Sequence, residues 1–293
     1  MISLVSPLFV PGDHPDSFQE AVDCGTDSIV FDLQDSCAPE NKARARQNIV
    51  SFIEEYSSGQ SPDIITVDKP VLIGVRINGV NSQEYPKDLE ALQAVSDQLD
   101  FVMQPLVNES KAMTETKQLL KDSDGAPVPI VALVETARGI VNAAEIASTR
   151  GVAQLAFGAG DYSEQLRVNH SNRDALLFAR STLATASVAF RLSPPVDTPY
   201  FNVANEDGLV DATHYASALG FSGKLCIHPS QCAIVTAAFK PSDNAIAWAR
   251  EAVEKFEEAV ARKESSVELE SGNYVDAPIY RRALDLLAKA GKQ

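Results

Sequence analysis

One stretch near the middle of the chain, residues 129–161, constrains the fold more than any other. It begins with an apolar run, Pro129–Val134, whose Val and Ile content predicts a buried strand. Apolar residues at helical spacing follow Thr136, which can cap that helix, and Gly151 ends it. A second apolar run, Val152–Phe157, predicts another strand. Because a helix joins them, the two strands are parallel, and their carboxyl ends lie at the same edge of one sheet.

Each of these two strands is followed by a carboxylate. Glu135 comes directly after the first strand, and Asp161 follows the second after a turn at Gly158–Gly160. At a shared sheet edge the two acids face one pocket, and Mg²⁺ is typically held by one or two carboxylates while water and substrate take its other positions. Taken alone, each acid is more typical of a solvated loop, but their matched placement favours a magnesium site.

The same alternation of strand and helix runs through most of the chain. Six further segments predict strands, each followed by a helical segment: Ser6–Val10, Ser28–Leu33, Val71–Ile77, Phe101–Pro105, part of Ser193–Asn205, and Gly223–His228. Eight such units predict a (β/α)₈ barrel over residues 1–240. Residues 241–293 form a helical extension, with helices predicted over Ser242–Lys263 and Ala277–Ala290 around a polar turn at Ser265–Asn273. We expect this short extension to pack on its own barrel or on a neighbouring subunit.

Composition narrows the class of protein. The chain of 293 residues is 45% apolar, which is enough for one large core, and its net charge of −15 argues against nucleic acid or an anionic membrane surface as a partner. Its four cysteines (Cys24, Cys37, Cys226 and Cys232) show no paired metal spacing and are typical of reduced thiols in a cytoplasmic protein. We also expect no signal peptide and no membrane span.

In a (β/α)₈ barrel the catalytic groups lie at the carboxyl ends of the strands. That rule selects six polar residues: Asp32, Asp35, Arg76, Glu135, Asp161 and His228. Arg76 can bind a carboxylate or stabilise an oxyanion, and a structural salt bridge to Asp32 or Asp35 is an equal alternative. Asp32 and Asp35 are candidates for orienting the metal ligands or metal-bound water without binding the metal directly. Asp35 would orient the water, and the alternative is that it caps the next helix. For His228 a buried, hydrogen-bonded role is favoured over catalysis.

Several segments, taken in order, carry a resemblance to a known family. They are LFVPGDHPDSFQEAVDCGTDSIVFDLQDS, VRINGV, ALVETARGIVNAAEIA, LAFGAGDYSEQL and GFSGKLCIHPSQ. Together they resemble the citrate lyase β-subunit-like proteins of the HpcH/HpaI aldolase superfamily, over nearly the whole chain. The resemblance implies a Mg²⁺-dependent (β/α)₈ lyase that splits a 3-hydroxyacyl-CoA thioester, of the citryl-CoA, malyl-CoA or citramalyl-CoA type, into a keto acid and an acyl-CoA. It implies equally the reverse condensation.

The resemblance also implies roles for individual residues. The family's metal ligands correspond to Glu135 and Asp161, the pair that the strand pattern selects, and its V-R-x-N arginine corresponds to Arg76. Arg76 and Glu135 would also bind the substrate. Family members are commonly trimers, or hexamers made from trimers, whose C-terminal segment reaches the neighbouring active site. Its aspartate corresponds to Asp276, which would protonate the departing enolate or take the acetyl-CoA proton in synthesis. A role as the N-cap of the last helix is compatible with that chemistry.

Three departures from the family pattern concern the acyl-CoA substrate. Gln34 stands where the family often has Glu, Leu106 where it often has Lys, and Ser271 where it often has Asp. The metal-binding positions are kept, so the reaction class is kept, while the acyl and CoA contacts stay open. Two other hypotheses remain. One is a class II pyruvate aldolase that needs no CoA, against which Asp276 argues; the other is a non-catalytic subunit of the same fold, against which the intact site residues argue.

Overall fold

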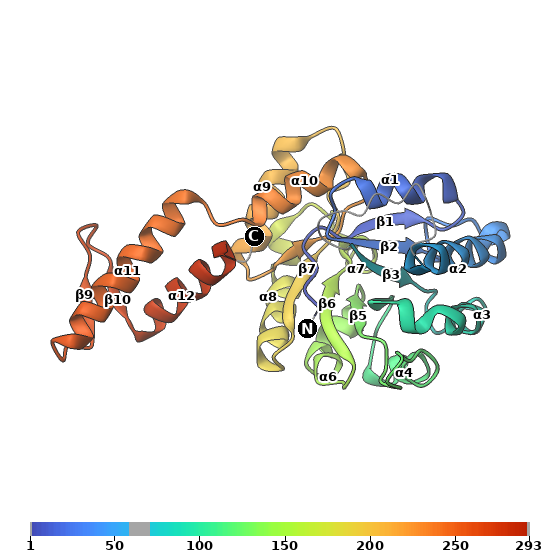
Figure 1. Ribbon diagram of the computed structural model, residues 1–293, viewed down its shortest axis with the longest axis horizontal. Helices are drawn as coiled ribbons and strands as arrows, with labels where there is room; N and C mark the ends of the chain where they lie inside the picture. The colour runs from blue at the N-terminus through green and yellow to red at the C-terminus, as the bar shows by residue number, and fades with distance from the viewer. Residues whose placement is uncertain (1, 59–70, 292–293) are drawn as a thin grey trace. The chain divides into compact units, whose positions relative to one another are not determined.

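The strands of the protein form a parallel β-barrel, and the computed structural model describes residues 2–58 and 71–291. Eight strands lie side by side in chain order (Figure 1). They are β1 (Leu8–Pro11), β2 (Ser28–Asp32), β3 (Leu72–Arg76), β4 (Phe101–Gln104), β5 (Ile130–Val134), β6 (Val152–Phe157), β7 (Ser193–Asp197) and β8 (Gly223–Lys224). The first and last strands join through the main chain, because Phe9 N donates to Cys226 O at 2.9 Å. The (β/α)₈ barrel predicted from the sequence is confirmed.

Apolar side chains fill the barrel interior. Every residue of β2 and β5 is buried, as expected of strands covered on both faces. The interior cluster includes Val30, Phe101, Met103, Val131, Leu133, Ala156, Val196 and Leu225. Gly74 makes room for the largest of them, since a Cβ atom on Gly74 would lie 2.3 Å from the Phe101 ring. The packed interior leaves the strand ends as the place for a site.

Helices surround the sheet (Figure 1). They are α1 (Phe18–Asp23), α2 (Lys42–Ser58), α3 (Tyr85–Leu92), α4 (Thr114–Leu119), α5 (Ala137–Val141), α6 (Ala143–Ala147), α7 (Ala159–Leu166), α8 (Arg173–Ala189), α9 (Glu206–Ala218) and α10 (Pro229–Phe239). Short 3₁₀ helices precede or follow them: η1 (Pro15–Ser17), η2 (Pro39–Asn41), η3 (Gln93–Gln98) and η4 (Ser110–Met113).

The structure corrects the sequence prediction at three places in the barrel. The helix predicted after Thr136 is divided into α5 and α6 at Asn142, whose side chain donates to the Asn108 carbonyl at 2.8 Å. The turn predicted at Gly158–Gly160 instead begins a helix, α7, because Gly158 is its N-cap. The eighth strand is shorter than predicted, since Ile227 N leaves the ladder and donates to the Gln231 side chain at 2.9 Å.

The last part of the chain is a second compact unit. The chain divides into Met1–Thr236 and Ala237–Gln293, close to the boundary expected at residue 240. The second unit holds α11 (Asp243–Ala261) and α12 (Ala277–Gly291), which pack around Ala249, Ala252, Phe256, Val275 and Ala283. The polar turn predicted between these helices is in fact a small antiparallel hairpin of β9 (Ser266–Glu268) and β10 (Tyr274–Asp276).

Within residues 2–58 and 71–291, none of the helices has both the length and the apolar content that crossing a bilayer requires.

Candidate functional site

A cavity lies at the carboxyl ends of the barrel strands. Four of the charged residues that the sequence selects line it together: Asp35, Arg76, Glu135 and Asp161. Apolar residues that the sequence analysis did not select, including Phe9, Leu133 and Leu225, complete its floor and wall. Phe9 and Leu133 lie within β1 and β5, so the strand-end rule would not have found them, whereas Leu225 directly follows β8.

Glu135 is the most buried acid in this cavity. Its residue surface is 5% exposed, and its Oε1 atom accepts a hydrogen bond from Leu106 N at 2.9 Å. Burial is the main cause that raises the pKa of Glu135, to about 8; the Leu106 hydrogen bond opposes the shift and the nearby Asp161 carboxylate adds to it. The main chain also crowds Oε2, because a Cβ atom on Gly158 would lie 2.4 Å from it. Glu135 is therefore held by Leu106 N on one side and has no room for a larger residue at Gly158 on the other.

Leu106 supplies its hydrogen bond from an uncommon backbone conformation. Its φ of 53° lies in the left-handed region, which non-glycine residues seldom adopt. Such conformations persist where surrounding structure holds them, often at functional sites. Leu106 also crowds Gly79, where a Cβ atom would meet its Cδ1 at 3.1 Å. The contact with Glu135 comes from the main chain, so it is independent of the side chain that departs from the family pattern.

Asp161 lies in the first turn of α7, beside the end of β5. Gly158 N donates to Val134 O at 3.2 Å, which joins the end of β5 to the start of α7. On the other side, Ala159 N donates to Thr198 Oγ1 at 3.1 Å. Burial chiefly, and then Glu164, raises the pKa of Asp161, while Arg76 opposes the shift. These main-chain bonds fix Asp161 in the same cavity as Glu135.

Arg76 forms the buried salt bridge that the sequence left as an alternative. Its Nε and Nη2 atoms donate to the two oxygens of Asp32 at 2.7 and 2.6 Å. Burial opposes ionisation of Asp32, but the charge and hydrogen bonds of Arg76 outweigh it and hold the pKa of Asp32 below its usual range. Arg76 still lines the cavity, with Nη1 3.5 Å from Asp35 and its guanidinium carbon 4.4 Å from the Phe9 ring centroid. Asp32 therefore orients Arg76 from behind.

The remaining sequence-selected residues lie in different surroundings. The side chain of Asp35 is 66% exposed at the cavity rim. Its partial burial is still the main cause that raises the pKa of Asp35. His228 is exposed, which corrects the prediction of a buried histidine; its Nδ1 accepts from Ser230 N at 3.2 Å at the start of α10. Asp276 lies in the second unit, where its side chain accepts from Ile279 N at 3.1 Å and so caps α12.

The donor set in the cavity suits a divalent cation. Asp35, Glu135 and Asp161 bring three carboxylates near one arginine that Asp32 already pairs. The charge of Asp161 raises the pKa of both Asp35 and Glu135. Among the described residues, no three His, Cys, Asp or Glu side chains converge to enclose a metal. A site with two carboxylates and open positions fits Mg²⁺, which keeps several waters, better than Zn²⁺, which prefers a closed set of nitrogen and sulfur ligands.

Comparison with known proteins gives consistent relatives. A model of the family described as HpcH/HpaI aldolase/citrate lyase matches residues 6–229. The citrate lyase subunit beta-like protein of Mycobacterium tuberculosis is 32% identical over 292 residues, which cover 97% of this chain and 95% of that protein. The L-malyl-CoA/beta-methylmalyl-CoA lyase of Cereibacter sphaeroides is 28% identical over 308 residues, covering 97% and 93%.

Solved structures also resemble most of the chain. The crystal structure of CitE from Mycobacterium tuberculosis in complex with magnesium, acetoacetate and coenzyme A matches with a TM-score of 0.79 and 31% identity, covering 99% of this chain and 98% of that one. The citrate lyase beta subunit of the same organism, complexed with oxaloacetate and magnesium, matches with a TM-score of 0.67 and 30% identity, covering 82% and 98%.

Proposed function

Because the chain belongs to the HpcH/HpaI aldolase/citrate lyase family, as its motifs predicted, we propose that it is a Mg²⁺-dependent carbon–carbon lyase acting on a 3-hydroxyacyl-CoA thioester. It releases a keto acid and an acyl-CoA, or runs the reverse condensation. Relatives named citrate lyase subunit beta and malyl-CoA lyase, and a neighbour bound to magnesium and coenzyme A, support this reaction class. The observation that carries the proposal is the Glu135 and Asp161 pair beside Arg76.

Glu135 and Asp161 would hold the metal. When bound there, Mg²⁺ supplies Lewis-acid stabilisation of the charge that develops on the keto acid. Glu135 must first lose the proton that burial favours, and the Leu106 N–H then keeps one carboxylate oxygen in place. The main-chain bonds at both ends of the Gly158–Ala159 segment keep Asp161 opposite it.

Arg76 would bind the keto acid and stabilise the developing oxyanion. The bidentate bond to Asp32 fixes the plane of the guanidinium, and this leaves Nη1 as the edge that faces Asp35 at the cavity rim. A guanidinium oriented before the reaction stabilises new charge without a reorganisation cost. Phe9, which lies against the same guanidinium, reduces the access of water to it.

Asp276 would transfer the proton to or from the thioester fragment. Its carboxylate is exposed at the start of α12, at the end of the hairpin. We place this residue in the active site of a neighbouring subunit, with residues 241–293 packing on that neighbour. A general acid must lie within hydrogen-bond reach of the carbon it protonates, so the site would be complete only in the assembly.

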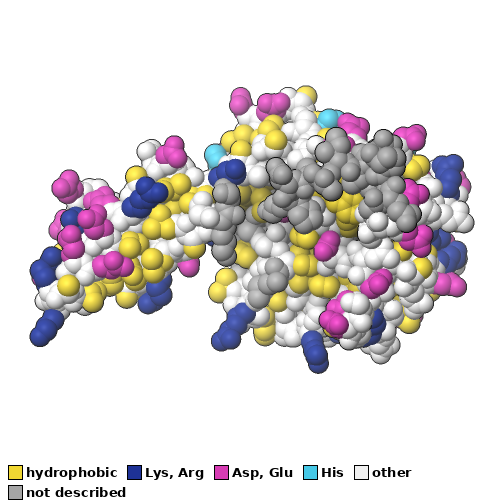
Figure 2. Space-filling model, viewed as in Figure 1, with side chains coloured by type: hydrophobic (Ala, Val, Ile, Leu, Met, Phe, Trp, Pro, Cys, Tyr) yellow, Lys and Arg dark blue, Asp and Glu magenta, His cyan; other side chains and the backbone are white. Residues whose placement is uncertain are grey.

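Exposed apolar side chains support an oligomer, which we propose to be a homotrimer or a hexamer made from trimers. In the barrel unit, Val141 on α5 and Phe178 and Val188 on α8 are largely exposed. In the second unit, Val260 and Tyr274 are exposed, and Figure 2 shows hydrophobic side chains along much of this unit. Apolar surfaces of this kind usually mark interfaces between proteins.

The cysteines support a cytoplasmic location. Cys24, Cys37, Cys226 and Cys232 are all free, and three of them are buried. Free buried thiols are typical of proteins kept in a reducing compartment.

An activity assay with CoA thioesters tests the proposed function. The purified protein with Mg²⁺ is given (3S)-malyl-CoA, citramalyl-CoA and citryl-CoA, and the released keto acid is followed as its phenylhydrazone. We expect cleavage of one thioester, loss of that activity with EDTA or Glu135→Gln, and no loss with Glu90→Gln, which removes an exposed carboxylate on α3.

Two results would contradict this function. Turnover of free hydroxy-keto acids without any CoA ester would identify a class II pyruvate aldolase, and it would remove the role given to Asp276. No turnover of any substrate, in a protein that still binds Mg²⁺, would identify a non-catalytic subunit.

A further inference from the structure

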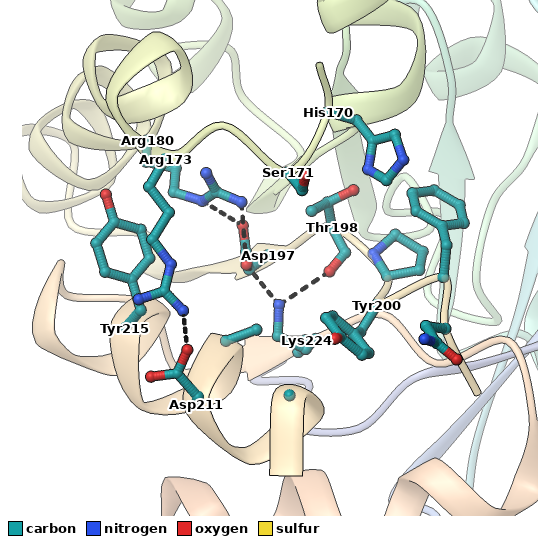
Figure 3. Close-up of a pocket in the computed structure, with 15 residues that line it drawn as sticks. His170, Ser171, Arg173, Arg180, Asp197, Thr198, Tyr200, Asp211, Tyr215 and Lys224 are labelled. Carbon is teal, nitrogen blue, oxygen red and sulfur yellow. Dashed lines mark hydrogen bonds and ion pairs between the residues drawn. The ribbon is translucent and has the colours of Figure 1, made fainter. Parts of the chain in front are cut away.

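A second cavity lies beside the first, in the barrel unit (Figure 3). It has a volume of about 320 Å³ and is lined from the ends of β7 and β8 and from helices α8 and α9. Thr198, Pro199 and Phe201 line both cavities, so the two are neighbours. The proposed lyase chemistry uses none of the charged residues that line this second cavity.

The inner wall of this cavity carries an excess positive charge. Lys224 Nζ donates to Asp197 Oδ2 at 2.6 Å and to Thr198 O at 3.1 Å, as Figure 3 shows. Arg180 Nε donates to the other oxygen of the same Asp197 at 2.8 Å. The side chains of Lys224, Arg180 and Asp197 are only 2%, 7% and 1% exposed. Two buried cations thus share one carboxylate, and one positive charge has no counterpart among them.

Asp197 carries one negative charge, which offsets only one of the two positive charges on Lys224 and Arg180. Burial opposes its ionisation, but Lys224 and Arg180 outweigh burial and hold the pKa of Asp197 below its usual range. An uncompensated buried charge is costly for a protein, and this one borders a cavity that an anion could enter. The local charge contrasts with the net charge of −15 for the whole chain.

The rim of the cavity adds a third cation and aromatic surface. Arg173 forms an ion pair with Asp211, and its guanidinium carbon lies 4.5 Å from the Tyr215 ring centroid. Arg173 is 43% exposed, so its remaining donors are accessible from solvent. Tyr200 and Phe201 line the opposite part of the cavity. Three cations and only two carboxylates therefore line this partly aromatic space.

We propose that this second cavity is an anion-binding subsite, which takes a phosphate or carboxylate group carried on an apolar body. Guanidinium and ammonium groups bind such anions through charge-assisted hydrogen bonds, and the rings of Tyr215, Tyr200 and Phe201 pack against the body. The anion belongs either to the far end of the thioester substrate or to a separate small metabolite. The inference rests on the cavity and its charges, and it holds whichever reaction the first cavity catalyses.

Binding to the metal-free protein tests the subsite. The protein is stripped with EDTA and dialysed, which removes any metal that would hold an anion in the first cavity, and a dependence of binding on Arg173, which lines only the second cavity, assigns the binding to that cavity. Isothermal titration calorimetry with inorganic phosphate and with phenyl phosphate is expected to give one site per chain, with phenyl phosphate tighter. Arg173→Gln should weaken binding roughly tenfold, as loss of one charged hydrogen bond implies.

A matched variant separates a built site from general charge effects. Arg150 is an exposed arginine that precedes β6, at the amino end of the strands, so Arg150→Gln removes the same charge far from the cavity. Equal weakening by Arg150→Gln and Arg173→Gln, or no saturable binding by the wild-type chain, would overturn the proposal. Competition then assigns the source: displacement of phenyl phosphate by coenzyme A identifies the thioester substrate, and binding that coenzyme A leaves unchanged identifies a separate metabolite.

Discussion

The raised pKa of Glu135 predicts that Mg²⁺ binding releases a proton and strengthens with pH. A carboxyl group with a pKa of about 8 is mostly protonated at neutral pH, and only its ionised form is a good ligand. Protonation then multiplies the apparent dissociation constant of Mg²⁺ by about 100 at pH 6, about 11 at pH 7 and about 2 at pH 8. At pH 7 the cost is about 1.4 kcal/mol. A glutamate with an ordinary pKa would change the constant by only about 3% over this range.

Isothermal titration calorimetry of the EDTA-stripped and dialysed protein measures both quantities. The Mg²⁺ affinity should rise about 50-fold from pH 6 to pH 8 and then level off. At pH 7, titrations in two buffers of different ionisation enthalpy should give a release of about 0.9 proton per Mg²⁺. The Mg²⁺ affinity rises with pH because the pKa of Glu135 is raised in the metal-free protein. Below that pKa the carboxyl group is protonated and Mg²⁺ binding is weakened; above it the carboxylate is ionised and Mg²⁺ binds with its full affinity.

The control and the contradicting result are both direct. Glu90→Gln removes an exposed carboxylate on α3 and should leave the pH profile unchanged. A Mg²⁺ affinity that changes by less than about twofold between pH 6 and pH 8, with no proton released at pH 7, would show that Glu135 is already ionised in the folded chain. The argument from burial would then be wrong.

Three further tests with variants examine the geometry of the site. Gly158→Ala places a Cβ atom 2.4 Å from Glu135 Oε2, so titration should show at least tenfold weaker Mg²⁺ binding, whereas Gly160→Ala, with nothing within 4 Å, should match the wild type; equal effects would contradict the crowding. Asp32→Asn removes the carboxylate that holds the site's arginine and should lower kcat/KM by about 100-fold, or about 2.7 kcal/mol, with Mg²⁺ affinity retained; unchanged kinetics would assign that ion pair to stability alone. Asp276→Asn and Glu135→Gln should each be inactive, but co-expression should restore activity in mixed oligomers if each site draws on two subunits, and continued inactivity would refute the shared site.

The barrel was predictable because its signals are local. Most of the strands are short apolar runs, and β6 has the predicted bounds, Val152–Phe157, since both of its ends are marked by glycine. The helix α7 was missed because Gly158–Gly160 is typical of a turn, and helix formation there depends on the bond from Ala159 N to Thr198. That partner lies 39 residues further along the chain, which no local pattern reveals.

The sequence predicted which charged residues line the cavity better than it predicted the contacts that they make. The strand-end rule brought Glu135, Asp161 and Arg76 to one cavity, because parallel strands end at one edge. It could not decide between a salt bridge and a substrate contact for Arg76, since both need the same placement. The structure shows that Asp32 occupies two donor positions of the guanidinium and that Arg76 nevertheless lines the cavity.

Leu106 shows that a site can retain a main-chain contact at a position where its side chain departs from the family pattern. Loss of the lysine that the family often has at this position removes a charge, yet the Glu135 contact is made by the main-chain N–H at 2.9 Å. What the contact requires is the left-handed backbone at φ 53°, and with it the space that Gly79 leaves for the Leu106 side chain. The geometry proposed to bind the metal therefore depends on backbone conformation and on two glycines, Gly79 and Gly158, more than on the residue type at position 106. Substrate preference, which depends on side chains, is where this departure should have its effect.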